Sequence, residues 1–203
     1  MELRLAMLGD SIAAGQGAAR PHDNIGRRLA RGLRRDGFEA RPRIFARAGS
    51  RSSGLEQQVD VALEWEPHLA VVVVGANDVT NRTPPREAAA DLAAAVRRLR
   101  DCGAEVVVAP APDLSVVPQV PGFLRGPVRA ASARLRRAQV EAAAAAGARI
   151  ADGDGATSGS FGSDPALFSA DRFHPSSAGY ALIAGELLPH VLAAARELSG
   201  ASG

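Results

Sequence analysis

The feature that most constrains the fold of this sequence is a regular alternation between short apolar runs and longer segments of helical pattern. The short runs have the length and apolar content of strands and lie at residues 3–8, 43–46, 69–74, 105–109 and 149–151. The helical segments lie at residues 23–36, 53–65, 84–102, 127–146 and 176–198. Each strand is therefore expected to be joined to the next by a helix.

This alternation predicts a parallel β-sheet that is covered by helices on both faces. The four valines at 71–74 are apolar at every position, which is typical of a central strand buried on both sides. Helical crossovers between successive strands favour the parallel arrangement. We expect a single domain over residues 1–203, with a three-layer α/β/α sandwich and a flavodoxin-like, five-stranded parallel sheet. The last few residues are expected to form a flexible tail.

Short polar blocks follow the first three predicted strands, and one more lies near the C-terminus. They are GDSI at residues 9–12, AGS at 48–50, GAND at 75–78 and DRFHP at 171–175. In open α/β sheets the ligand crevice lies beyond the carboxyl ends of the strands. We therefore expect the blocks to lie close together at that edge of the sheet.

Serine, histidine and aspartate in these blocks suit nucleophilic catalysis. A serine hydroxyl is a weak nucleophile until a base takes its proton, and Ser11 leaves the first strand in a turn that can expose its Oγ. His174 can act as that base, because imidazole exchanges protons near neutral pH. Asp171 precedes it by three residues and can accept a hydrogen bond from the far ring nitrogen. The expected catalytic residues are Ser11, Asp171 and His174.

The order and spacing of the four blocks resemble those of the GDSL or SGNH hydrolase family, named for its serine, glycine, asparagine and histidine. The resemblance covers nearly the whole chain and departs from the family name only at Ile12, where that name has leucine. It implies a serine esterase or lipase that cleaves carboxylic esters through an acyl-serine intermediate. It also implies an oxyanion hole made by the backbone N–H groups of Ser11 and Gly49 and the side-chain amide of Asn77. Such an enzyme acts on a small-molecule acyl ester and needs no cofactor and no metal.

Two other functions are compatible with the blocks. An acyltransferase would form the same acyl-serine and pass the acyl group to a sugar or another alcohol in place of water. A non-catalytic flavodoxin-like binding module would use residues 9–17 to bind a phosphate, but it gives Asp171 and His174 no task. A pair of carboxylates, Asp10 and Asp78, could also suggest a metal site. We interpret both as braces that accept hydrogen bonds from backbone amides.

The basic residues exclude several other kinds of chemistry. All 24 Lys and Arg residues are arginines, which excludes a P-loop lysine, a Schiff base and a Ser-Lys dyad. Arginines crowd residues 27–35, but without a recognition motif or interleaved aromatic residues we interpret them as a solvated helix face and expect no nucleic-acid partner. We also expect no membrane span, no secretory leader and a cytoplasmic location. The sequence carries no signal for an oligomeric state.

Two segments without helical pattern are long enough to shape a binding site. Residues 110–126 are rich in proline, and residues 152–166 are rich in glycine and are expected to form a second long loop. Loops of this length in a compact domain commonly form pocket walls or lids. The single cysteine, Cys102, is expected to be a buried or partly buried structural thiol.

Overall fold

The computed structural model describes residues 2–151 and 156–200, and a parallel sheet forms its centre. Five strands lie in the order β2-β1-β3-β4-β5, and every neighbouring pair is parallel. They are β1 (Leu3–Gly9), β2 (Ala40–Ile44), β3 (Leu69–Val73), β4 (Glu105–Ala109) and β5 (Arg149–Ile150). The predicted α/β class and the five-stranded parallel sheet are confirmed.

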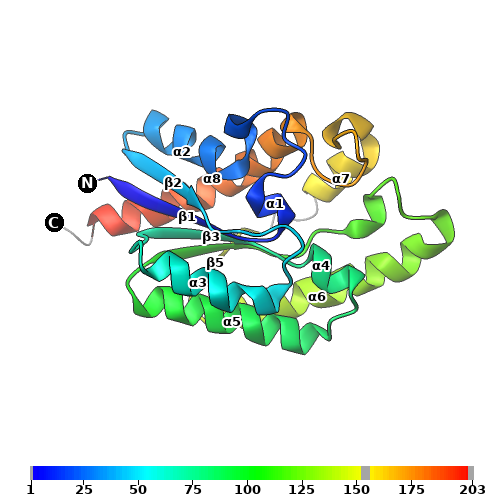
Figure 1. Cartoon of the computed structure of the whole chain (residues 1–203), viewed down its shortest axis with the longest axis horizontal. Helices are drawn as coiled ribbons and strands as arrows, with labels where there is room; N and C mark the ends of the chain where they lie inside the picture. The colour runs from blue at the N-terminus through cyan, green and yellow to red at the C-terminus, as the bar shows by residue number, and fades with distance from the viewer. Residues whose placement is uncertain (1, 152–155, 201–203) are drawn as a thin grey trace.

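Helices cover both faces of the sheet, as Figure 1 shows. One face carries α2 (Ile25–Arg35) and α8 (Ser177–Gly200), and the other carries α3 (Leu55–Leu63), α5 (Pro85–Asp101) and α6 (Arg125–Ala145). Three shorter helices are α1 (Ser11–Ala14), α4 (Ala76–Thr80) and α7 (Ala156–Ser163). The expected three-layer sandwich is therefore present.

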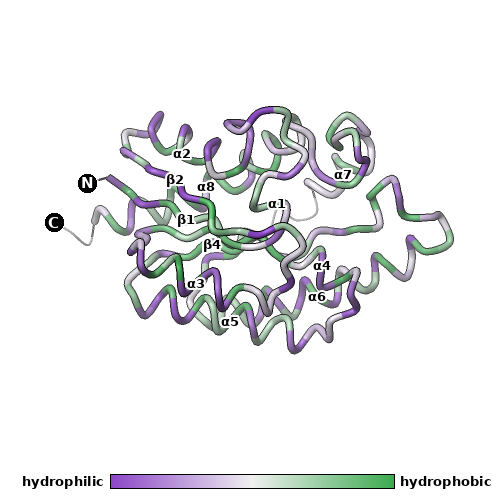
Figure 2. Tube along the Cα trace, viewed as in Figure 1, coloured by the Kyte–Doolittle hydropathy of each residue, from purple (hydrophilic) through white to green (hydrophobic). Residues whose placement is uncertain are grey.

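Strand β1 illustrates why the sheet needs cover on both sides. Leu5 and Met7 are fully buried in the core cluster that includes Leu29 of α2. Ala6 and Leu8 point the other way and are fully buried in the cluster formed with α3 and α5. Burial of one such large aliphatic side chain is worth about 1.5–3 kcal/mol, so both layers stabilise this strand. In Figure 2 the hydrophilic colours gather on the outward turns of α2, α3 and α5.

The strand register aligns the starting points of the functional loops. Gly9 at the end of β1 lies opposite Val73 at the end of β3, and Val73 lies opposite Ala109 at the end of β4. The segments that leave these three strands therefore start side by side at one edge of the sheet. This edge is where the sequence predicts the ligand crevice.

The second strand is shifted from its predicted position. It spans Ala40–Ile44, whereas the sequence pattern favours residues 43–46. Strand β2 lies at the edge of the sheet, where Pro42 is tolerated because one side of the strand needs no hydrogen bonds. Most of its residues are at least partly exposed, so it lacks the apolar run by which strands are recognised.

The prediction of a loop at residues 152–166 is wrong for the second part of this segment. Helix α7 spans Ala156–Ser163 and a 3-10 turn follows at Pro165–Leu167, while residues 152–155 lie outside the described residues. Phe161 in α7 packs edge-to-face on Phe168 at 5.0 Å, a tertiary contact that sequence periodicity does not report. Cys102 is exposed after the end of α5, so the expectation of a buried thiol is also wrong.

Helix α8 bears on the prediction that no segment spans a membrane. Judged by length and composition alone, this helix of the described residues could cross a membrane. Its Tyr180, Leu187 and Val191 are, however, buried in the core cluster that it shares with α2, and a core helix passes the same test. The helix is therefore weak evidence for a span, and the cytoplasmic location stays a prediction. The expected flexible tail includes residues 201–203, which lie outside the described residues.

Candidate active site

Ser11 stands at the carboxyl end of β1, on the first turn of α1. Asp10 caps this short helix by accepting a hydrogen bond from the backbone N–H of Ile12 at 2.9 Å. Gly9 makes the sharp exit from the strand possible, because a Cβ there would lie 1.8 Å from the carbonyl oxygen of Val73. Ser11 is 5% exposed, so most of the residue is shielded from solvent.

Asp171 and His174 lie in the loop between α7 and α8 and contact each other directly. The Nδ1 atom of His174 lies 2.6 Å from Oδ2 of Asp171. The other carboxylate oxygen accepts hydrogen bonds from the backbone amides of Phe173 and His174 and from the Ser169 hydroxyl. Partial burial alone would raise the pKa of Asp171, but these hydrogen bonds outweigh it and hold the pKa well below its usual range.

The structure brings Ser11 to the other side of the same imidazole ring. Nε2 of His174 lies 3.0 Å from Oγ of Ser11. An ionised Asp171 can only accept hydrogen bonds, so Nδ1 carries the proton and Nε2 is left to accept the Ser11 hydroxyl proton. Serine, histidine and aspartate thus form a continuous hydrogen-bonded chain across residues that are 163 apart in sequence.

Gly49 and Asn77 lie on the loops that follow β2 and β3. Gly49 is exposed and has a φ of 79°, a left-handed conformation that favours glycine. Among residues 2–151 and 156–200 its backbone N–H has no protein acceptor. Asn77, in α4, donates a hydrogen bond from Nδ2 to the carbonyl oxygen of Ser50 at 3.1 Å. This bond joins the second and third blocks and leaves one amide proton of Asn77 for another acceptor.

The two other aspartates of the blocks brace these loops, as the sequence predicts. Asp78 is fully buried and accepts hydrogen bonds from the backbone N–H and the hydroxyl of Ser52. Burial raises the pKa of Asp10 to about 6, against hydrogen bonds from the amides of Ile12, Ala76 and Gly75 that lower it. No group of three or more His, Cys, Asp and Glu side chains in the described part of the chain could hold a metal ion.

Two buried glutamines hold the site together and were not predicted as site residues. Gln58 accepts a hydrogen bond from the N–H of Gly9 and donates to its carbonyl and to the hydroxyl of Ser50. Gln139 accepts from the N–H of Ala111 and donates to the carbonyl of Val74. The sequence does carry a signal for Gln58, because this polar residue lies on the face of its helix that is otherwise apolar.

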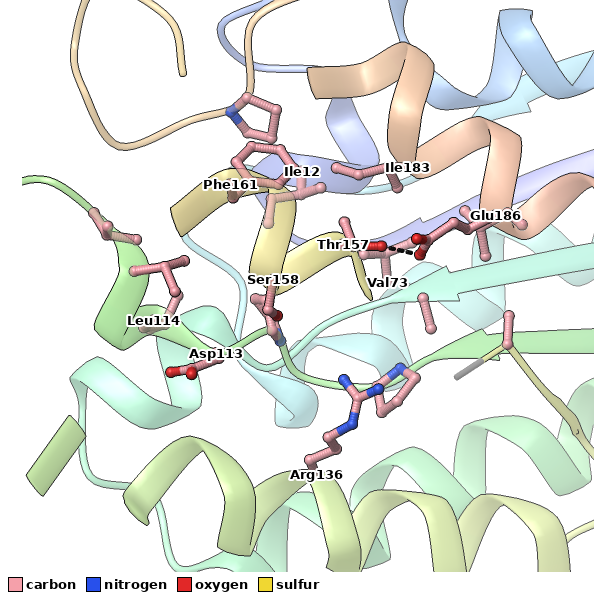
Figure 3. Close-up of a pocket in the computed structure, with 18 of the residues that line it drawn as sticks. Ile12, Val73, Asp113, Leu114, Arg136, Thr157, Ser158, Phe161, Ile183 and Glu186 are labelled. Atoms are coloured by element: carbon pink, nitrogen blue, oxygen red, sulfur yellow. Dashed lines mark hydrogen bonds between the residues drawn. The ribbon is translucent and has the colours of Figure 1, made fainter. Parts of the chain in front are cut away.

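The loop at residues 110–126 forms one wall of a cavity, which confirms its predicted part as a pocket wall. Neither Ser11 nor His174 lines this cavity. The cavity has a volume of about 140 Å³ and lies under α7, with α8 at its side (Figure 3). Ile12, Phe173 and Pro175, which neighbour Ser11 and His174 in sequence, also line it. On the rim of this site, Gln119 donates a hydrogen bond to the backbone carbonyl of Asp171.

Comparison with known proteins identifies relatives of the chain. The GDSL-like esterase Rv1075c of Mycobacterium tuberculosis is 40% identical over 187 residues, which are 90% of this chain. The chain spans 60% of the length of that relative. TesA superposes with a TM-score of 0.75 at 23% identity, over 92% of this chain and 96% of that one. A lipase/acylhydrolase from Enterococcus faecalis superposes with a TM-score of 0.73 at 22% identity, over 94% and 95%.

The two structural likenesses show the shared α/β/α fold, and the family model extends the relationship to the sequence. The model of the GDSL-like lipase/acylhydrolase family matches residues 7–182, a range that includes all four polar blocks. By this match, the chain belongs to the GDSL-like lipase/acylhydrolase family.

Proposed function

We propose that the chain hydrolyses small-molecule carboxylic esters through an acyl-serine intermediate at Ser11. The observation that carries the proposal is the hydrogen-bonded chain from Ser11 Oγ to His174 Nε2 at 3.0 Å and from His174 Nδ1 to Asp171 Oδ2 at 2.6 Å. This is the arrangement that a nucleophile, its base and the group orienting that base require. The name of the relative from Mycobacterium tuberculosis, a GDSL-like esterase, agrees with it.

The reaction has two halves that use the same histidine. Ser11 Oγ attacks the ester carbonyl carbon while His174 takes the hydroxyl proton, and His174 then gives that proton to the leaving alcohol. Water enters, loses a proton to His174 and attacks the acyl-serine, which releases the acid and restores the hydroxyl of Ser11. Asp171 stays ionised and stabilises the imidazolium that forms in each half.

The tetrahedral intermediates carry a negative oxygen that needs donors already in place. We assign this part to the backbone N–H groups of Ser11 and Gly49 and to the side-chain amide of Asn77. Ser11 opens helix α1, so its N–H belongs to the first turn, where amides lack intrahelical acceptors. The bond from Asn77 to Ser50 supports the assignment, because it orients the amide and leaves a second proton to donate.

The test compares the wild-type protein with Ser11→Ala, and with Ser53→Ala as a matched control at an exposed serine. Each is treated with a fluorophosphonate probe and assayed with p-nitrophenyl acetate, butyrate and octanoate. We expect labelling and turnover in the wild type and the control, and a loss of roughly 10⁵–10⁶ in kcat in Ser11→Ala. A folded wild-type protein that is neither labelled nor active would contradict the proposal and favour a binding module.

A second assay separates hydrolysis from transfer. The products of p-nitrophenyl butyrate turnover are analysed with and without an added sugar or short alcohol. We expect free butyrate as the main product under both conditions. An acylated acceptor as the main product would identify the protein as an acyltransferase that uses the same serine.

A further inference from the structure

Part of the cavity is lined by apolar residues that neighbour the nucleophile and its base in sequence, although Ser11 and His174 do not line it themselves. Ile12 follows Ser11 directly, and Phe173 and Pro175 flank His174 on both sides. Phe161 of α7 and Ile183 of α8 continue this apolar lining (Figure 3). An acyl chain attached to Ser11 that enters this cavity would contact an apolar surface, and burial of that chain would favour binding.

A polar pair from two helices interrupts this lining. The hydroxyl of Thr157 in α7 donates a hydrogen bond to a carboxylate oxygen of Glu186 in α8, and both side chains line the cavity. Figure 3 shows the two side chains pointing toward one another, with Ile183 and Val73 nearby. Burial raises the pKa of Glu186, whereas the positive charge of Arg136 lowers it. The Glu186 carboxylate is half-buried, and its lone pairs that are not bonded to Thr157 need hydrogen bonds from water.

We propose, as an extension of the esterase function proposed above, that this cavity receives the acyl chain of the substrate and that Thr157 and Glu186 limit its length. A chain that stays within the apolar part displaces water from Ile12, Phe161 and Phe173. A longer chain has to cover Glu186, and covering a carboxylate with methylene groups removes its water without replacing the lost hydrogen bonds. The same side chain therefore favours short acyl groups and disfavours long ones.

The energetics of methylene burial give the expected size of the effect. Each methylene that enters an apolar surface raises kcat/KM by about fourfold. In the wild type we expect this gain to stop, and then to reverse, at the chain length that reaches Glu186. Where the polar pair is absent, the gain continues to longer chains.

The experiment measures kcat/KM for p-nitrophenyl esters from acetate to decanoate. The main variant is the double substitution Thr157→Val with Glu186→Leu, because removing both partners leaves no unsatisfied hydroxyl. Glu186→Gln is the second variant, since it keeps the size of the side chain and an oxygen that can accept from Thr157. Glu197→Leu is the matched control: it makes the same change on the exposed face of the same helix.

We expect the ratio of kcat/KM for octanoate over butyrate to rise by about tenfold or more in the double variant. A smaller rise of a few fold is expected in Glu186→Gln, and none in Glu197→Leu. Acetate hydrolysis should stay within a few fold of wild type in all three, because a two-carbon chain does not reach the pair. Circular dichroism and the melting temperature establish that each variant is folded.

The failure of this inference is distinguishable from the failure of the proposed function. An active wild type whose chain-length profile is unchanged in both Glu186 variants overturns the inference and leaves the esterase function standing. If the double variant does not fold, the profile of Glu186→Gln decides in the same way. A wild type that hydrolyses no ester and is not labelled at Ser11 overturns both.

Discussion

At the residue scale, the side chain of Asn77 combines two tasks on one amide. One N–H of its Nδ2 donates a hydrogen bond to the carbonyl oxygen of Ser50, and the other is the donor that we assign to the oxyanion. The first task fixes the amide before substrate arrives, so no reorganisation is needed when the negative charge develops. A backbone donor such as the N–H of Gly49 has this preorganisation from the loop itself.

We predict that Asn77→Ala lowers kcat by about 10²–10³, the typical loss for one oxyanion donor, with a smaller change in KM. The measurement is steady-state hydrolysis of p-nitrophenyl butyrate. Asn81→Ala is the control, because Asn81 is exposed, follows the same helix, and its side-chain amide donates to Asn77 O and Thr80 Oγ1. Near wild-type kcat in folded Asn77→Ala would remove this residue from the proposed oxyanion hole.

Asp10 makes the stability of the fold depend on pH. Its pKa of about 6 lies above the ordinary value of 3.8 because the side chain is buried. The folded protein therefore keeps a proton that the unfolded chain loses between pH 3.8 and pH 6. The stabilisation is complete below pH 3.8 and is lost as the pH rises through about 6.

The expected outcome is a fall of about 2.5 kcal/mol in the free energy of unfolding between pH 4 and pH 7, measured relative to Asp10→Asn. Urea unfolding at several pH values gives both curves, and their difference removes the contribution of all other groups. Asp101→Asn, at an exposed position, should follow the wild-type curve. Parallel curves for wild type and Asp10→Asn would mean that Asp10 does not hold a proton in the folded state near pH 5.

At the element scale, Gln58 connects helix α3 to the end of strand β1. Its amide makes hydrogen bonds to both the N–H and the C=O of Gly9, and a third to Ser50. We predict that Gln58→Leu, which keeps the size of the side chain, destabilises the fold by about 2–4 kcal/mol. The cause is that the buried N–H of Gly9 loses its acceptor, while the carbonyl of Gly9 loses one donor and keeps the N–H of Arg47. Urea unfolding measures the change, and the neighbouring exposed Gln57→Leu should shift stability by less than about 0.5 kcal/mol.

The elements whose positions the sequence predicts best are the long ones, in which apolar residues recur with a regular period. The central strand β3 and helices α5 and α6 carry long apolar patterns, and their predicted positions agree with the structure within a few residues. Helices α1 and α4 were missed because four or five residues are too few to show a helical period. They form through the cap of Asp10 and the turns that leave the sheet.

In the candidate site too, only residues that belong to a recognisable sequence pattern could be predicted. Ser11, Asp171 and His174 could be named from sequence because they lie in short blocks with a chemical logic of their own, and the structure brings them into contact. The pairing of Thr157 with Glu186 could not, because the two residues are 29 apart and meet only through the packing of α7 on α8. Neither residue belongs to a recognisable motif, so only the assembled structure shows that they share a cavity.

At the scale of the whole molecule, the sheet divides the core into two layers that share the same strands. Each layer has a natural spectroscopic probe, since the chain has one tryptophan and one tyrosine. Trp65 packs on Phe45 beside the α3 and α5 layer, and Tyr180 is fully buried in the α2 and α8 layer. Strands β1 and β3 contribute side chains to both layers, so neither layer can unfold without exposing the other.

We therefore predict that the chain unfolds as one cooperative unit, in keeping with a single domain. Urea unfolding followed by Trp65 fluorescence, Tyr180 near-ultraviolet circular dichroism and far-ultraviolet circular dichroism should give one shared midpoint. Trp65→Phe isolates the tyrosine signal and should leave the far-ultraviolet midpoint coincident with it. Separate midpoints would show that the two layers unfold independently. In that case the hydrogen bond between Ser11, just after β1, and His174, before α8, would join two units of different stability, and activity would be lost at the lower midpoint.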